Sequence, residues 1–181
     1  MKRPIVIEGP DGCGKSFLVR RLVEFYPGLR PYHSGGPPDS QMGLMLRMLR
    51  IQRVIDETPS AIVLDRVPMI SELVYGPVMR DELRMPRKES LLYLAALHPV
   101  VVYCKIPPQD ATHYMVKEAK EHKTQAYTEA VGRRASRIHQ AYHEIMLELA
   151  GDYGVSVFHY DWRVSGEWQR LINHFYLNGA L

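Results

Sequence analysis

Short runs of apolar and β-branched residues alternate along the chain with longer stretches in which apolar residues recur every three or four positions. The short runs predict buried strands and the longer stretches predict amphipathic helices. Strands are expected over 4–9, 61–66, 99–106 and 154–161, with a short one around Tyr32. Helices are expected over 15–26, 41–57, 71–80, 87–98, 107–122, 128–150 and 166–176.

Strands that are separated by helices predict parallel pairing, because a parallel connection needs a long crossover. The runs are apolar throughout, as in a sheet covered by helices on both faces. The expected fold is therefore α/β, a doubly wound three-layer sandwich with a parallel sheet of about five strands. A length of 181 residues fits one domain over 1–181. The expected buried stripes are Phe17, Leu18, Leu22 and Phe25 in the first helix, and Leu44, Met45, Met48, Leu49 and Ile55 in the second.

The composition is that of a globular protein, with 46% apolar and 24% charged residues. A net charge of +3 suits a protein that handles anions but is too weak to predict a surface for duplex nucleic acid. Cys13 and Cys104 lie far apart, which indicates a reducing compartment. No apolar run approaches membrane-span length and no signal-peptide core follows the first residues, so a cytoplasmic protein is expected.

The segment EGPDGCGKS carries the clearest chemistry in the chain. Gly9, Gly14, Lys15 and Ser16 fit the pattern G-x-x-x-x-G-K-[ST] between a predicted strand and a predicted helix. Glycines let backbone amides turn inward around phosphate oxygens, and the helix N-terminus adds further donors. Lys15 can bridge the β- and γ-phosphates of ATP, and the Ser16 hydroxyl can bind Mg²⁺. The predicted ATP-binding residues are Asp11, Gly12, Cys13, Gly14, Lys15, Ser16, Phe17, Arg133 and Arg134.

Asp65 and Arg66 form a second polar group, at the end of the strand expected over 61–66. A carboxylate there lies beside the phosphate loop, where it can hold Mg²⁺ together with Ser16. The guanidinium can bind a second phosphate. The chain has no N-K-x-D string to read a guanine base, as a GTPase requires. The predicted catalytic residues are Lys15, Asp65 and Arg66, acting on a donor and an acceptor that both carry phosphate.

The motifs together resemble those of the thymidylate kinase family over roughly residues 3 to 161. EGPDGCGKS is similar to the family's E-G-x-D-G-x-G-K-[ST]. DRVPMISELVYG is similar to D-R-[YF]-x-x-S-x-x-A-[YF]-Q, and YHSGGPPDSQMGLMLRMLR and IHQAYHEIMLELA resemble two further family segments. The resemblance implies transfer of the γ-phosphate of ATP to a deoxynucleoside monophosphate, with Mg²⁺. The acceptor-binding residues that it implies are Asp11, Leu49, Arg53, Arg66, Ser71, Tyr75 and Tyr142.

Two departures from the family pattern concern the base of the acceptor. Leu49 falls near the place of the family's stacking aromatic, and Gly76 stands where the family has a glutamine. Both changes remove groups that read a thymine, so the acceptor is expected to be dTMP or another dNMP, a purine among them. The identity of the base stays open.

Two other functions compete with this prediction. A deoxynucleoside kinase acts on a sugar hydroxyl and needs a general base. The segment that corresponds to the one carrying this base in related deoxynucleoside kinases, residues 32–38, holds no carboxylate. A nucleotide-binding regulator could keep the loop and lose the transfer chemistry.

A lid over the phosphates is expected at about 117–134, where Lys117, Lys120 and Lys123 or Arg133 and Arg134 supply positive charge. Whether the chain forms a homodimer stays open.

Overall fold

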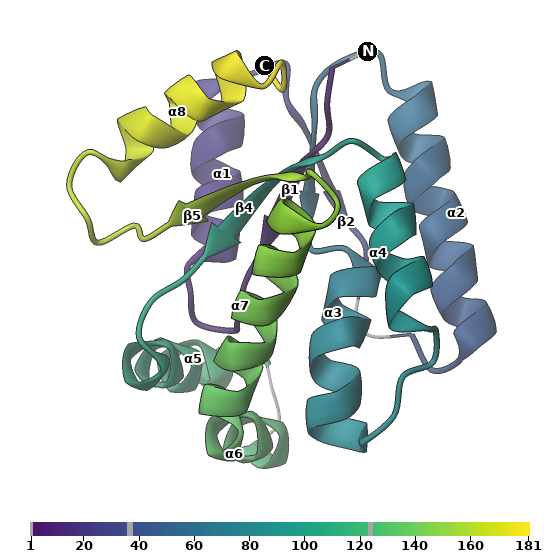
Figure 1. Ribbon diagram of the computed structural model, residues 1–181. Coiled ribbons are helices and arrows are strands. Elements are labelled where there is room, and N and C mark those ends of the chain that lie inside the picture. The colour runs from purple at the N-terminus through teal and green to yellow at the C-terminus, as the bar shows by residue number, and fades with distance from the viewer. Residues whose placement is uncertain (1, 36–37, 123–124) are drawn as a thin grey trace.

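The computed structural model describes residues 2–35, 38–122 and 125–181. Figure 1 shows a central sheet with helices packed on both sides. The strands are β1 (Ile5–Glu8), β2 (Arg30–His33), β3 (Ile62–Asp65), β4 (Val100–Cys104) and β5 (Ser156–Tyr160). The helices are α1 (Lys15–Phe25), α2 (Gln41–Glu57), α3 (Pro68–Tyr75), the π-helical turn η1 (Gly76–Arg80), α4 (Arg87–Ala96), α5 (Pro108–His122), α6 (Gln125–Arg133), α7 (Ala135–Gly151) and α8 (Glu167–Leu177).

The five strands form one parallel sheet in the order β2-β3-β1-β4-β5. This arrangement confirms the predicted parallel sheet. Residue Ile7 of β1 lies opposite Asp65 of β3, and Asp65 lies opposite His33 of β2. Because all strands point the same way, their carboxyl ends and the loops that follow them meet at one edge of the sheet.

Helices cover both faces of the sheet, which confirms the three-layer architecture. One face packs against α2, α3, α4 and α7, and the other packs against α1 and α8 (Figure 1). Alternation along β1 explains how one strand serves both layers: Val6 joins the first core, and Ile5 and Ile7 join the second.

The predicted buried stripes of the first two helices are wrong in part. Leu18 and Leu22 of α1 are buried, but Phe17 and Phe25 are about half exposed. In α2, Met45 and Leu49 are exposed, and the buried face consists of Leu44, Met48, Ile51 and Ile55. Apolar residues occur on more than one side of each helix, so the sequence pattern did not identify the buried face uniquely.

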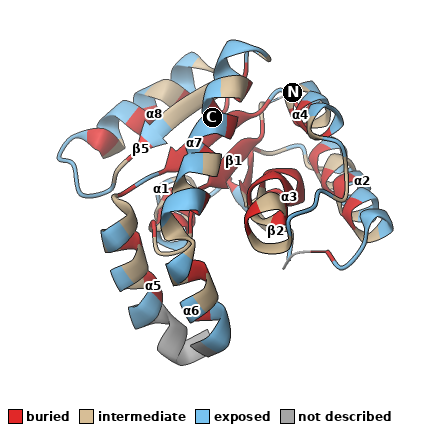
Figure 2. Cartoon of the chain, turned by 60° about the horizontal axis from the view of Figure 1, so that its bottom comes forward, coloured by how far each residue is buried: buried red, intermediate tan, exposed pale blue. Residues whose placement is uncertain are grey.

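The helix expected over 128–150 is divided in two. The chain turns at Arg134, between the end of α6 at Arg133 and the start of α7 at Ala135. Helices α5 and α6 extend side by side away from the sheet (Figure 2), at the place of the expected lid. Lys117 is exposed there, whereas the side chains of Lys120 and Lys123 lie outside those that the structure describes.

No helix in the described residues is long and apolar enough to span a membrane.

Candidate functional site

The loop between β1 and α1 requires glycine at two close approaches. Gly9 has φ +143°, and a Cβ on it would lie 2.2 Å from the backbone oxygen of Cys104. Gly12 has φ +79°, and its Cβ would lie 2.1 Å from the backbone oxygen of Ala111. The first turn of α1 carries no acidic residue and no side-chain cap, so its free N–H groups can bind an anion.

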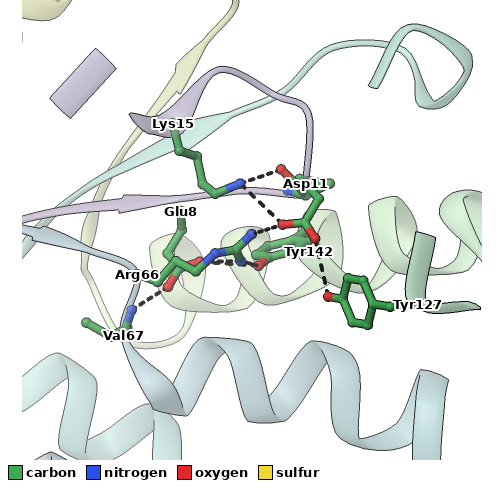
Figure 3. Close-up of polar contacts among 8 residues, drawn as sticks. Glu8, Asp11, Lys15, Arg66, Val67, Tyr127 and Tyr142 are labelled. Atoms are coloured by element: carbon green, nitrogen blue, oxygen red, sulfur yellow. Dashed lines mark hydrogen bonds and ion pairs between the residues drawn. The ribbon is translucent and has the colours of Figure 1, made fainter. Parts of the chain in front are cut away.

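Lys15 begins α1 and points back over the loop. Its Nζ donates to the backbone oxygen of Pro10 at 2.5 Å and lies 4.0 Å from the Asp11 carboxylate (Figure 3). Burial lowers the pKa of Lys15, and the nearby positive charge of Arg66 lowers it further. A phosphate bound at the loop would supply the negative charge that favours the protonated lysine.

A cavity of about 370 Å³, here called the loop cavity, opens at the N-terminus of α1. Its lining residues are Asp11, Gly12, Gly14, Lys15, Ser16, Phe17, Arg20, His33, Gly35, Asp65 and Arg66. The structure thus brings together all of the predicted loop residues except Cys13, which is buried beneath them. Arg133 and Arg134 do not line this cavity; Arg133 lies 3.9 Å from Glu129, and Arg134 donates to a backbone oxygen of its own helix turn.

Ser16 and Asp65, the predicted metal ligands, line the same cavity as Lys15. Magnesium is commonly held by one or two protein oxygens, with waters and substrate phosphates completing its shell. No cluster of three or more His, Cys, Asp or Glu suited to a metal occurs among the described residues, and such a cluster is not needed for this mode. His33 Nδ1 lies 3.0 Å from Asp65 Oδ2. His33 was not among the predicted site residues, although its place at the end of β2 aligns it with Asp65.

Arg66 is held by four partner residues, from β1, the loop after it and α7. Its Nη2 donates to Asp11 Oδ1 at 2.5 Å, and its Nη1 donates to the Tyr142 hydroxyl at 2.6 Å (Figure 3). Nη1 also lies 3.8 Å from Glu8 Oε2. The backbone of Arg66 has φ +67°, an unfavourable value for a residue with a side chain, and its N–H donates to Ile7. This network fixes one guanidinium direction.

Glu8 lies behind Arg66 and is completely buried. Its Oε1 accepts from the backbone N–H of Val67 at 2.6 Å, and its Oε2 accepts from the Tyr142 hydroxyl at 3.3 Å. Burial raises the pKa of Glu8 to about 7, against the opposing effect of the Arg66 charge. Glu8 does not line the loop cavity, so it supports Arg66 from within the protein.

A second cavity, of about 360 Å³ and here called the α3 cavity, adjoins the first. Asp11, Gly35 and Arg66 line both cavities. The remaining lining residues are Ser34, Pro38, Pro68, Ser71, Glu72, Tyr75, Met79, Arg80 and Tyr127. The two cavities therefore meet at the Asp11–Arg66 ion pair.

Five of the predicted acceptor residues lie at the site, four in the wall of the α3 cavity and one buried behind it. Ser71 and Tyr75 line the α3 cavity together with Asp11 and Arg66. Tyr142 is buried behind them, bonded to Arg66, and does not line the cavity.

Leu49 and Arg53 are not brought to the site. Leu49 is 62% exposed, and Arg53 Nε donates to Glu57 Oε1 at 2.7 Å on the outer side of α2. Helical phase explains this, because both residues lie off the face that carries Met48 and Ile55 into the core.

Glu72, Arg80 and Tyr127 are among the lining residues of the α3 cavity that the sequence did not predict. Tyr127 comes from α6, and its hydroxyl donates to Asp11 Oδ2 at 3.3 Å (Figure 3). Glu72 and Arg80 lie eight residues apart and meet through a 2.6 Å ion pair. Residues eight positions apart do not normally contact each other in a helix, so no sequence pattern indicated the Glu72–Arg80 pair.

No protein-family model matches the sequence, and no curated protein matches it. Solved structures do match. The YorR protein from Bacillus subtilis, in complex with phosphorylated GDP, is 19% identical with a TM-score of 0.68, over 96% of this chain and 94% of that one. Polyphosphate kinase 2 from Arthrobacter aurescens TC1 is 14% identical with a TM-score of 0.66, over 98% of this chain and 67% of that one.

The deoxyadenosine kinase from M. mycoides with bound dATP is 14% identical with a TM-score of 0.53, over 97% of this chain and 99% of that one. At these identities the likeness concerns the fold. The sheet order, the glycine loop and the three-layer packing therefore define an α/β protein with a phosphate-binding loop and the fold that these kinase structures share.

Proposed function

We propose that the protein transfers the γ-phosphate of ATP to a deoxynucleoside monophosphate and releases the diphosphate. One observation carries the proposal: Arg66 stands where the loop cavity meets the α3 cavity. A guanidinium at this boundary can contact the phosphate of a ligand in either cavity. Two adjoining cavities with one shared cation suit a reaction between two phosphorylated ligands.

The loop cavity suits the ATP phosphates. Free amides at the start of α1 and the Lys15 ammonium would bind the β- and γ-phosphates. Ser16 and Asp65 would hold Mg²⁺, which neutralises charge on the phosphates when bound. Lys15 is held over the loop by Pro10, so little reorganisation is needed before it contacts a phosphate.

The α3 cavity suits an acceptor that is already a phosphate. Its two carboxylates are Asp11, which is paired with Arg66, and Glu72, which is paired with Arg80. A sugar hydroxyl would need a base to take its proton, whereas a monophosphate is an anionic nucleophile. Arg66 would hold that phosphate against the γ-phosphate of ATP, with dTMP or another dNMP as the acceptor.

The α5–α6 pair would act as the lid, at about 117–134. Tyr127 of α6 already reaches Asp11, so this helix borders the site in the present structure. Arg133 is the last residue of α6 and Arg134 follows it in the turn, and both lie outside the two cavities. Closure over ATP would have to bring their charge toward the transferring phosphoryl group.

A direct assay tests the proposal. The protein is given ATP and Mg²⁺ with each of dTMP, dGMP, dAMP, dCMP and dUMP, and in parallel with the corresponding nucleosides. Diphosphate formation from at least one monophosphate, faster than phosphorylation of any nucleoside, is expected. ATP binding without transfer to any acceptor would instead identify a nucleotide-binding regulator and would contradict the proposal.

A deoxynucleoside kinase is the second candidate, because Asp11 lies at the boundary between the cavities, where a base for a sugar hydroxyl would stand. The likeness to the deoxyadenosine kinase of M. mycoides adds to this alternative. Asp11→Asn separates the two. In a nucleoside kinase the change would remove the base and lower kcat by about 10²- to 10⁴-fold. In a monophosphate kinase it would mainly raise the acceptor KM.

A further inference from the structure

A buried ion pair forms part of the wall of the α3 cavity. Glu72 is only 2% exposed, and Arg80 Nη2 donates to both of its carboxylate oxygens, at 2.6 and 2.7 Å. The backbone N–H of Arg84 donates to the same carboxylate at 3.0 Å. A buried carboxylate needs such partners, and here they occupy both oxygens of Glu72. The pair therefore holds the Arg80 guanidinium at a fixed place in the cavity.

Gly76 provides the space in which this pair forms. A Cβ at Gly76 would lie 3.1 Å from Glu72 Oε1, 3.2 Å from Arg80 Nη2 and 2.6 Å from the backbone oxygen of Glu82. Gly76 opens the π-helical turn η1, which ends at Arg80. Turns of this kind are frequent at functional sites. The position where the resemblance expects a base-reading glutamine is thus filled by the side chains of an ion pair.

The pair leaves hydrogen-bonding capacity in the cavity wall unused. Within the described part of the chain, Arg80 Nε and the Tyr75 hydroxyl are buried and make no hydrogen bond. Arginine carries donors only, whereas a tyrosine hydroxyl can donate and accept. A buried donor without a partner is costly, so a ligand acceptor toward which these two groups can turn would be favoured.

We propose that Arg80, held by Glu72 across Gly76, reads the base of the acceptor and selects guanine. This inference rests on the proposed function, because it takes the cavity's occupant to be a nucleoside monophosphate. With the phosphate at Arg66, at the start of α3, the base extends along the helix toward Arg80. Guanine presents two adjacent acceptors, O6 and N7, which is the pattern that arginine recognises best.

The other bases present less suitable edges to a fixed cation. Adenine carries an amino donor where guanine carries O6, and cytosine also presents an amino donor. Thymine and uracil each present a single carbonyl acceptor at this edge, beside a methyl group in thymine. Met79 adds an adaptable apolar surface that accommodates a purine ring system. Both oxygens of Glu72 already accept hydrogen bonds from Arg80 or Arg84, so an amino group of a base would have to compete with these donors for the carboxylate. The selection therefore favours dGMP over the other four monophosphates.

The test compares kcat/KM for five monophosphates, dGMP, dAMP, dTMP, dCMP and dUMP. For the unaltered protein dGMP is expected to be the best acceptor. Arg80→Gln is expected to lower kcat/KM for dGMP by about 5- to 150-fold, the range for one bidentate base contact. The value for dTMP should change by less than about threefold, because thymine makes no such contact. An equal loss for all five acceptors would overturn the inference.

Two further variants guard against a folding defect. Arg80→Gln leaves the buried Glu72 without its Arg80 partner, so the double variant Glu72→Gln/Arg80→Gln removes both charges of the pair. It should show the same selective loss for dGMP. Arg87→Gln is the matched control, because Arg87 pairs with Glu148 at 2.6 Å and lines neither cavity. Retained dGMP preference in a folded double variant would contradict the inference.

The failure of this inference and the failure of the proposed function give different results. If the unaltered protein phosphorylates no monophosphate, the proposed function fails, and calorimetric Kd values for the same five compounds decide the question of the base. Binding of dGMP at least about tenfold tighter than the others, with loss of that difference in Arg80→Gln, would still support base reading by Arg80. Equal Kd values would overturn it.

Discussion

Arg66 donates to Asp11 at 2.5 Å across the boundary between the loop cavity and the α3 cavity. Asp11 belongs to the loop after β1, and Arg66 follows β3, so the contact joins the ends of two neighbouring strands. A phosphate that enters beside Arg66 competes with Asp11 for the same donors. The ion pair thus fixes the guanidinium before a ligand arrives and can be exchanged for a ligand contact afterwards.

Lys15→Ala tests the charge at the phosphate loop. Loss of the ammonium should raise the barrier of the transfer step by about 3 kcal/mol or more, so kcat should fall at least a hundredfold. Steady-state kinetics with saturating ATP and acceptor measure the change. Lys88→Ala, at an exposed position of α4, is the control and should leave kcat unchanged. Comparable kcat values for the two variants would exclude a role of Lys15 in the reaction.

Arg66→Ala should affect the acceptor more than ATP. Removal of the guanidinium takes away the grip on the acceptor phosphate, so the acceptor KM should rise at least as much as kcat falls. Tyr142→Phe provides a graded comparison, because it removes only the hydroxyl that accepts from Arg66 Nη1. Its acceptor KM should rise by a smaller factor in the same assay. An unchanged acceptor KM in Arg66→Ala would mean that the arginine is structural.

Gly12→Ala tests the close packing of the phosphate loop. The new Cβ would meet the backbone oxygen of Ala111 at 2.1 Å, in a backbone conformation with φ +79°. The strain should lower the free energy of unfolding by about 1–3 kcal/mol, measured by urea denaturation. Gly28→Ala is the matched control, because its Cβ would meet nothing within 4 Å. The control should stay within about 0.5 kcal/mol of the unaltered protein. Equal stability of the two variants would show that the loop can move away from α5.

Glu8→Gln should change how stability depends on pH. The pKa of Glu8 is raised from 4.5 to about 7 in the folded state, so the native protein binds this proton more tightly than the unfolded chain does. The stability contributed by protonated Glu8 is complete below pH 4.5 and is lost as the pH rises through 7. Glutamine does not titrate. Relative to the unaltered protein, the free energy of unfolding of the variant should therefore increase by up to roughly 3 kcal/mol as the pH rises over this range.

Urea unfolding at several pH values between 4.5 and 8 measures this difference, and Glu24→Gln at an exposed position of α1 is the control. Parallel pH profiles of Glu8→Gln and the unaltered protein would show that the buried carboxylate stays ionised throughout.

The sequence predicts those parts of the fold that depend on local patterns. The buried strands β1, β3 and β4 consist of continuous apolar runs, and the glycine loop has a fixed spacing, so both were recognisable. The edge strand β2 was only a weak prediction, because three of its four residues are exposed and its pattern resembles a loop. A strand of this kind is defined by its pairing with β3, which no local pattern encodes.

The candidate site was predictable only where its residues follow a motif. Asp11, Lys15, Asp65 and Arg66 could be identified because each stands in the loop or at a strand end. The Glu72–Arg80 pair could not be identified, because it depends on a π-helical turn that brings together residues eight positions apart.

Leu49 and Arg53 were assigned to the acceptor from a resemblance, but both lie on the outer side of α2 and their side chains do not reach the cavity.

The packing of Trp162 against the phosphate loop gives the protein a built-in optical reporter. A Cβ on Gly14 would lie 2.9 Å from the Cδ1 of this indole, so the ring borders the start of α1. The other tryptophan, Trp168, stacks with Arg21 on a different side of α1. In a Trp168→Phe variant, the emission spectrum would come from Trp162 alone. Donor binding could then be followed in real time by fluorescence, without a labelled nucleotide and separately from turnover.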